Sequence, residues 1–287
     1  MPEGPEIRRA ADRIARVLVG QEIVDVYIGL PGIRRFEPKL RGSTVTAIDT
    51  RGKAMLTRFD SGLTLYSHNQ LYGVWLTARR DRPPETGRSL RVALHTATKS
   101  ALLYSASEIE VLNDAQVAAH TFLNRIGPDI LDPQVTPAEV AARMDERRFR
   151  NRTVGALYLD QSFMAGVGNY LRSEILFSAG VHYMDKPSDL APGLRRGLAR
   201  ATLSLSRRSY RTRGVTLDPS LARSLRDQGL PYEQYRFWVF RREGLPCHTC
   251  GAPIECLTVS SRGLYYCPVC QRRASSHSET VSSNRSS

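Results

Sequence analysis

The sequence contains no run of apolar residues that approaches the roughly 18 needed to cross a bilayer. Its beginning also lacks the apolar segment of a secretory signal peptide, because Glu3, Glu6 and Arg8 already carry charge there. Cysteine is scarce, with five in 287 residues, and four of the five form two CxxC pairs. That pattern is typical of metal binding in a reducing compartment, not of disulfides. Together these absences predict a cytoplasmic protein.

Acidic residues are outnumbered, with 28 Asp and Glu against 41 Lys and Arg, which gives a formal charge of +13. Such a balance favours a polyanionic partner, nucleic acid first and an anionic membrane surface second. A generally solvated basic protein would have the same charge, so charge alone does not decide. Apolar residues make up 41% of the chain, enough for the cores of one large domain or two ordinary ones.

Two kinds of periodicity divide the chain. Apolar residues recur at helical spacing over residues 5–18, and Gly20 is a natural stop for that helix. Short runs of strand character then predict an antiparallel sandwich or barrel with the first helix packed against it. The predicted strands are 23–30, 44–50, 54–59, 63–67, 73–77, 90–94 and 101–104. Later in the chain the predicted helices are 138–145, 154–160, 169–179 and 190–207.

These patterns predict an α+β protein of several domains. A Pro- and Asp-rich stretch separates the strand-rich half from the helical half and predicts a linker. The last residues are rich in serine without apolar periodicity, which predicts a disordered tail. The expected division is a first domain at 1–126, the linker at 127–137, a helical domain at 138–235, a cysteine segment at 236–271 and the tail at 272–287.

The cysteine segment predicts one zinc ion. Cys247 and Cys250 form one CxxC pair, Cys267 and Cys270 form the other, and sixteen residues lie between them. Four thiolates close a tetrahedral site with no open position, so the predicted role is structural. Two separated pairs suit one shared ion better than redox chemistry. Cys256 lies outside the pattern and is expected to be a buried small hydrophobe.

Several polar residues have both an ordinary and a functional interpretation. Arg262 is expected near the tip of a hairpin, where it suits a phosphate or is simply solvated. Asn169 follows two glycines at the start of a helix, where it caps the helix or donates to a phosphate. Lys53 lies in a turn that enters a strand and is either solvated or a cation in a cleft. The residues alone leave these alternatives open.

Two further stretches are unusual. Gln70, Leu71 and Tyr72 interrupt two strand-like runs and form either a wedge for a base stack or a buried loop that packs on Trp75. Pro2 immediately precedes the first helix. It is either a tolerated second residue, exposed once the initiator methionine is removed, or a secondary amine kept free for chemistry.

Considered together, the motifs resemble one family over nearly the whole chain. They are "MPEGPEI", "RGKA", "YSHNQLYGVW", "NRIGPD", "RFRNR", "LDQSFMAGVGNYLRSEIL", "SYRTRG" and "SSRGLYYCPVC", and their order and separation also match. The sequence resembles the formamidopyrimidine-DNA glycosylase and endonuclease VIII family of base-excision repair enzymes. "MPEGPE" and "HNQLYG" resemble its endonuclease VIII branch. The implied architecture is a helix plus β-sandwich domain, a helix-two-turns-helix domain and a zinc finger, with DNA in the basic cleft between them.

The resemblance implies catalytic roles for five residues. Pro2 would be the nucleophile after removal of the methionine, and an α-amino group titrates near ~8, which leaves a usable neutral fraction. Glu3 would be the general acid that protonates the sugar ring oxygen, with Glu6 in support. Lys53 would bind a phosphate and assist β-elimination, and Arg262 would promote δ-elimination.

The resemblance also implies contacts to DNA. Asn169 and Arg125 would bind the backbone beside the flipped nucleotide, and Gln70, Leu71 and Tyr72 would fill the gap that the base leaves. The implied reaction is excision of an oxidised pyrimidine from duplex DNA followed by β,δ-elimination, with one structural Zn²⁺ and neither a catalytic metal nor a nucleotide cofactor.

The expected partner is double-stranded DNA with an oxidised base or an abasic site. The protein is expected to be a monomer in the bacterial cytoplasm, associated with the nucleoid. Two alternatives remain at this point. One is an oxidised-purine glycosylase of the same family, and the other is a non-catalytic zinc-containing DNA-binding protein.

Overall fold

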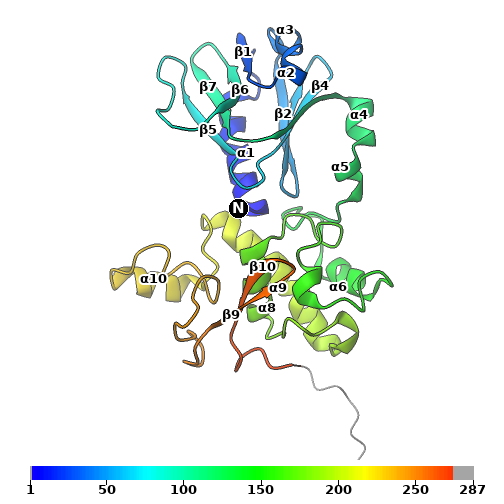
Figure 1. Ribbon diagram of the computed structural model, residues 1–287, viewed down its shortest axis with the longest axis vertical. Helices are drawn as coiled ribbons and strands as arrows, with labels where there is room; N and C mark the ends of the chain where they lie inside the picture. Colours follow the sequence, from blue (N-terminus) through cyan, green and yellow to red (C-terminus); the bar gives the residue numbers. More distant parts are fainter. Residues whose placement is uncertain (1, 274–287) are drawn as a thin grey trace, which may run out of the picture.

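The first helix forms the centre of one domain. The structure, a computed structural model, describes residues 2–273, so Met1 and all but the start of the predicted tail lie outside the described residues. Helix α1 (Gly4–Leu18) buries Ile7, Ile14 and Leu18, each at most 2% exposed. It contacts strands of both sheets of this domain, and its N-terminal end lies at the junction with the second domain (Figure 1).

The strand-rich half is the predicted sandwich. One sheet has the order β1-β6-β7-β5 and the other β2-β3-β4-β8, and every pairing in them is antiparallel. Apolar side chains from both sheets and from α1 form a single core, which confirms the predicted packing. The strands are β1 (Asp25–Ile28), β2 (Val45–Arg51), β3 (Ala54–Phe59), β4 (Leu63–His68), β5 (Val74–Arg79), β6 (Leu90–His95), β7 (Lys99–Tyr104) and β8 (Glu108–Asn113).

Strand β8 and four short helices were not predicted. The helices are α2 (Pro31–Arg34), α3 (Glu37–Leu40), α4 (Asp114–Ala119) and α5 (Thr121–Arg125). Each is six residues or shorter, too short for a helical period to emerge from the sequence. In β8 glutamates alternate with apolar residues, and β4 pairs with it along its whole length. Helices α4 and α5 then lead from this strand toward the second domain (Figure 1).

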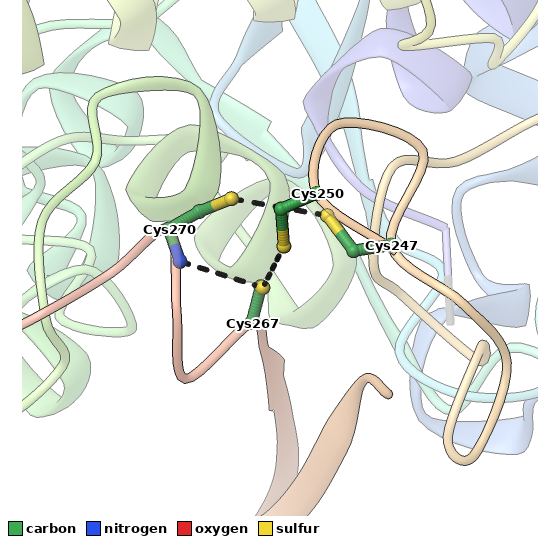
Figure 2. Close-up of side chains that lie close together, drawn as sticks. All are labelled: Cys247, Cys250, Cys267 and Cys270. Atoms are coloured by element: carbon green, nitrogen blue, oxygen red, sulfur yellow. Dashed lines mark hydrogen bonds between the residues drawn. The ribbon is translucent and has the colours of Figure 1, made fainter. Parts of the chain in front are cut away.

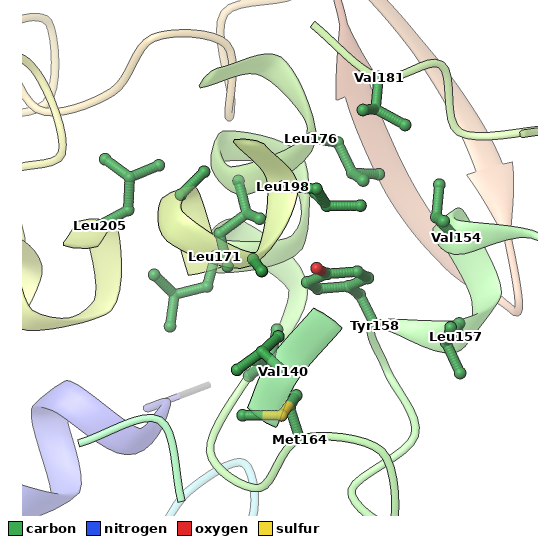
Figure 3. Packing of buried hydrophobic residues seen from close by; sticks show 14 of the residues in the cluster. Val140, Val154, Leu157, Tyr158, Met164, Leu171, Leu176, Val181, Leu198 and Leu205 are labelled. Atoms are coloured by element: carbon green, nitrogen blue, oxygen red, sulfur yellow. The ribbon is translucent and has the colours of Figure 1, made fainter. Parts of the chain in front are cut away.

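The second half is helical and shares one core with the cysteine hairpin. Tyr158 lies in the middle of this core (Figure 3). Its hydroxyl is hydrogen bonded to that of Thr202 at 2.8 Å. Leu264 and Tyr266 of the hairpin belong to the same cluster. The elements are α6 (Pro137–Asp145), α7 (Val154–Leu157), α8 (Asn169–Ser178), η1 (Pro187–Asp189), α9 (Pro192–Arg211), α10 (Pro219–Asp227), β9 (Glu255–Val259) and β10 (Arg262–Tyr266).

Two helix predictions need correction, and one further helix was not predicted. The helix predicted at 154–160 is a single turn that ends at Leu157, because the chain turns there. Helix α9 continues to Arg211, since the basic residues after 207 remain helical. Helix α10 was not predicted, and its short apolar face of Leu221, Ala222 and Leu225 is only partly buried. None of the described helices is long and apolar enough to span a membrane.

The predicted linker is tied to both domains. Asp129 accepts a hydrogen bond from the backbone N–H of Gly52 at 2.7 Å, and residues 129 and 165 form a parallel bridge. Close by, the N–H of Gly4 donates to the carbonyl of Gly166 at 2.9 Å. These contacts fix the turn before β3 and the start of α1 against the second domain. The predicted boundaries at 127 and 137 stay a prediction.

Candidate active site

The carboxylate of Glu3 caps a helix of the other domain. It accepts hydrogen bonds from the N–H groups of Gly168 and Tyr170, both at 2.8 Å, and of Leu171 at 3.3 Å. These donors form the N-terminus of α8, which favours an anion through its unpaired N–H groups and its dipole. Glu3 is 2% exposed. The second residue after the initiator methionine is therefore buried between the two domains.

Gly168 makes this contact possible. A Cβ at position 168 would lie 2.3 Å from the carboxyl carbon of Glu3, so any side chain there would displace the carboxylate. The sequence indicated an anion site at this helix start, and the anion that fills it is Glu3 of the same chain. Asn169 is not the cap, because the N-cap position belongs to Gly168. Its amide instead donates to the carbonyl of Gly263 in the hairpin at 2.8 Å.

Glu6 supports the same region from the next turn of α1. Its carboxylate accepts the N–H of Glu3 at 3.1 Å, the hydroxyl of Tyr170 at 3.1 and 3.2 Å, and the guanidinium of Arg9 at 3.0 Å. Arg9 in turn donates to the carbonyl of Ser209 on α9 at 2.7 Å. Glu6 thus holds the start of α1 in place against α8 and α9.

Glu3 lines a cavity of about 740 Å³, and residues of both domains form the walls of this cavity. Aromatic side chains form part of its wall, namely Phe122, Tyr170, Phe237 and Phe240. A cavity with aromatic walls and a few charged groups suits a nucleobase. The predicted site residues that line it are Pro2, Glu3, Glu6, Lys53, Gln70, Leu71, Asn169 and Arg262. The structure therefore brings together residues from five separate parts of the chain.

The charged groups in the cavity perturb one another. Burial raises the pKa of Glu3 from its ordinary 4.5 to about 7, although Lys53 and the N–H donors of α8 oppose this shift. Burial also lowers the pKa of Lys53, and Arg262 lowers it further while Glu3 raises it. A carboxyl with a pKa near neutral can give up a proton at physiological pH, which is the property of a general acid.

Arg172 connects the cavity to the hairpin and was not found from the sequence. It is fully buried, and its guanidinium donates to the side chain of Asn169 at 2.7 Å and to the carbonyls of Gly155 at 3.0 Å and Val259 at 3.3 Å. Burial lowers its pKa to about 10. Arg172 thereby fixes the hairpin that carries Arg262. A charged residue inside the apolar run "NYLRSEIL" is the sequence signal that identifies it.

The four predicted cysteines gather at the base of the hairpin (Figure 2). Their sulfur atoms all lie within 4.8 Å of one another, with Cys250 and Cys267 at 3.4 Å and Cys247 and Cys270 at 3.9 Å. Zinc–thiolate bonds of about 2.3 Å in a tetrahedron place sulfurs about 3.8 Å apart, so the cluster fits one Zn²⁺. Cys256 lies on β9 outside the cluster and is half-buried, not buried as predicted.

The loop between β4 and β5 presents its side chains outward. Leu71 is 51% exposed and Tyr72 69% exposed, so the alternative of a buried loop packed on Trp75 is wrong. Gln70 has a left-handed backbone with φ of 49°. The loop is closed by a hydrogen bond of 2.8 Å from the N–H of Gly73 to the carbonyl of Asn69. Leu71 lines the cavity, and this exposed aliphatic residue with the exposed aromatic residue that follows it is suited to contact with stacked bases.

Arg125 lies outside the main cavity. It ends α5, is exposed, and lines a neighbouring cavity of about 860 Å³. Phe122 and Gln161 line both cavities. The structure therefore places Arg125 next to the main cavity without bringing it to Asn169, with which it was paired in the sequence prediction.

The sandwich, the helical domain and the four-cysteine hairpin define a DNA glycosylase of the formamidopyrimidine-DNA glycosylase class. Family models for its N-terminal domain, its H2TH domain and the zinc finger found in FPG and IleRS match residues 1–107, 126–213 and 244–273. The chain is 49% identical to endonuclease 8 of Escherichia coli, and the match covers 94% of this chain and 100% of that protein. It is 48% identical to endonuclease 8 of Salmonella enteritidis, with 95% of this chain and 100% of that protein covered. The chain belongs to the formamidopyrimidine-DNA glycosylase and endonuclease VIII family.

Solved structures agree with the fold. Lactococcus lactis Fpg in complex with DNA containing N7-benzyl-Fapy-dG matches with a TM-score of 0.79 and 22% identity, over 95% of this chain and 100% of that one. The same protein bound to DNA with an oxidised pyrimidine matches with a TM-score of 0.78 and 21% identity, again over 95% and 100%.

Proposed function

We propose that this endonuclease VIII homologue excises oxidised pyrimidines from duplex DNA and then cleaves the strand at the resulting abasic site. Pro2 attacks C1′ of the damaged nucleotide, and the bond from C1′ to the base breaks. Glu3 donates its proton to the sugar ring oxygen, so that the ring opens and a Pro2 iminium remains. Lys53 binds an adjacent phosphate and assists β-elimination, and Arg262 promotes δ-elimination.

The observation that carries this proposal is the buried carboxyl of Glu3. It lies directly after Pro2, borders the cavity and has a pKa raised to about 7 by burial. Capping α8 accounts for the burial of this carboxyl, but not for its place directly after an N-terminal amine at the wall of a cavity. Perturbed carboxyls in such places cluster at functional sites. An acid beside an N-terminal amine suits glycosylase and lyase chemistry.

The zinc ion has a structural role in this proposal. When bound, it cross-links the two ends of the cysteine segment and so stabilises the hairpin. The residues that hold it are Cys247, Cys250, Cys267 and Cys270. The hairpin in turn places Arg262 at the cavity.

The remaining predicted residues contact DNA. Leu71 and Tyr72 enter the base stack where the nucleotide has left, next to Gln70 of the same loop, and Asn169 and Arg125 bind the backbone on either side. Duplex DNA with an oxidised base or an abasic site is the proposed partner. We further propose that the protein acts as a monomer in the bacterial cytoplasm near the nucleoid.

Borohydride trapping tests the proposal. Purified protein, with removal of Met1 verified by mass spectrometry, is incubated with duplexes that contain thymine glycol, 8-oxoguanine or an abasic site. A covalent adduct mapped to Pro2 and formed fastest with thymine glycol is expected. Faster trapping on 8-oxoguanine would favour the oxidised-purine alternative. Tight binding without an adduct on any duplex, or full activity of Pro2→Gly, would instead indicate a non-catalytic DNA-binding protein.

A further inference from the structure

Both polar atoms of the exposed Gln70 side chain are hydrogen bonded. Its amide nitrogen donates to a carboxylate oxygen of Glu108 at 2.9 Å, and its carbonyl oxygen accepts from the hydroxyl of Ser107 at 2.7 Å. Its backbone N–H also donates to the ring nitrogen Nδ1 of His68 at 3.2 Å. A surface glutamine normally samples several rotamers, so three contacts to one residue need an explanation.

Glu108 is itself fixed. Its second carboxylate oxygen accepts the hydroxyl of Tyr66 at 3.0 Å, and Tyr66 is fully buried with its ring against that of His120. Glu108 begins β8 and pairs with His68 at the end of β4, the strand that leads into the loop. Through Gln70, the loop is therefore hydrogen bonded to a carboxylate whose position is fixed by its bond to Tyr66.

The backbone of Gln70 explains why such an anchor is useful. A residue with a side chain at φ of 49° is disfavoured relative to the ordinary regions, and glutamine has no special tolerance for it. The loop also needs Gly73, because a Cβ there would lie 2.5 Å from the carbonyl oxygen of Asn69. Without side-chain contacts, the strained turn would relax into other conformations.

We infer that Glu108 is a positioning residue, which acts through Gln70 to keep the loop formed before DNA arrives, so that Leu71 and Tyr72 already point outward. The inference rests on the proposed function of the loop as a wedge. A preformed wedge does not have to be ordered when the base leaves the stack, and this lowers the barrier to base excision from duplex DNA. Chemistry on an abasic site in single-stranded DNA needs no wedge.

Glu108→Ala tests the inference, with Glu110→Ala as the matched control. Glu110 lies two positions further along the same strand and is likewise partly buried. It is hydrogen bonded to His120 and makes no hydrogen bond to Gln70 among the described contacts. Single-turnover excision of thymine glycol from a duplex should fall about tenfold in Glu108→Ala, the effect expected for losing a hydrogen bond to a charged group. Strand cleavage at an abasic site in single-stranded DNA should stay within twofold of the wild type.

A double-mutant cycle separates positioning from general support of the fold. If Glu108 acts through Gln70, adding Glu108→Ala to the Gln70→Ala variant should not lower the excision rate any further. Glu108→Gln should restore most of the lost rate, because its amide can accept from Gln70 through oxygen and donate to Tyr66 through nitrogen. Melting temperatures of all variants are measured in parallel.

Three results would overturn the inference. The first is an excision rate of Glu108→Ala equal to that of Glu110→Ala. The second is an equally large loss of excision rate when Glu108→Ala is added to Gln70→Ala, and the third is an equally large loss of the cleavage rate on the single-stranded abasic substrate. Failure of the proposed function is recognised separately. In that case the wild type itself forms no borohydride adduct on either substrate, whatever Glu108→Ala does.

Discussion

The pH dependence of base excision should reveal the buried carboxyl of Glu3. The proposed reaction needs this carboxyl protonated and the Pro2 amine neutral at the same time. The fraction of protonated Glu3 falls as the pH rises through its pKa of about 7. The neutral fraction of Pro2 rises through the ordinary α-amino pKa near ~8. The product of the two fractions is a bell-shaped profile.

The height and width of the bell follow from these two values. At pH 7.5, each group is in its reactive form in about a quarter of the molecules, so about 6% of the enzyme is competent. At pH 6 or pH 9 the competent fraction drops to about 1%, so excision should slow roughly sixfold on both sides.

Glu3→Gln removes the acid and should change the shape of the profile. Excision of thymine glycol should fall by roughly 10²-fold or more, and the residual rate should rise with pH and level off without the falling alkaline limb. A single-stranded abasic site already exposes an aldehyde in its ring-opened form, so strand cleavage there should lose much less. Glutamine cannot accept from all three N–H donors of α8, and we therefore also expect a lower melting temperature.

The assay is single-turnover cleavage of labelled oligonucleotides from pH 5.5 to 9.5 at constant ionic strength. Glu22→Gln, at an exposed glutamate on the first domain, is the matched control and should keep the wild-type profile. A wild-type rate that stays constant or keeps rising above pH 8 would refute the role of Glu3. So would a Glu3→Gln variant that retains the falling limb.

Three further predictions concern the glycine, the metal and the salt. Gly168→Ala should destabilise the protein by about 1–3 kcal/mol in calorimetry and abolish most excision, since its Cβ would overlap Glu3. Gly193→Ala in α9, where a Cβ meets nothing within 4 Å, should leave excision unchanged and should not destabilise the protein. Removal of zinc, verified by atomic absorption, should abolish strand cleavage, because the hairpin that carries Arg262 loses its cross-link; activity that survives metal loss would contradict this role. Affinity for a duplex with a tetrahydrofuran abasic analogue should fall steeply with salt in fluorescence anisotropy, as expected for many phosphate contacts, and a flat response would count against DNA as the partner.

Local patterns predicted much of this molecule. The first helix, seven of the strands and the four cysteines follow from periodicity and spacing, which act over a few residues. The contact of Glu3 with Gly168 spans 165 positions, and no pattern along the chain announces it. Glu108 was missed for the same reason, because its partners Gln70 and Tyr66 come from another strand and loop. Arg172 does have a local signal, its charge among apolar residues, but its carbonyl partners are far away in the chain. Helix α10 was missed because only three apolar residues at helical spacing, Leu221, Ala222 and Leu225, mark it.

The position of Glu3 at the start of α8 also has a consequence for synthesis on the ribosome. Pro2 and Glu3 leave the exit tunnel first, yet the helix that receives the carboxylate is translated more than 160 codons later. Arg262 follows almost another hundred codons behind. If Glu3 is the acid, as proposed, a nascent chain that has folded only its sandwich lacks the burial that raises the pKa of this carboxyl, and it also lacks Arg262. We therefore expect the proposed reaction to require the complete chain, which limits it to finished molecules.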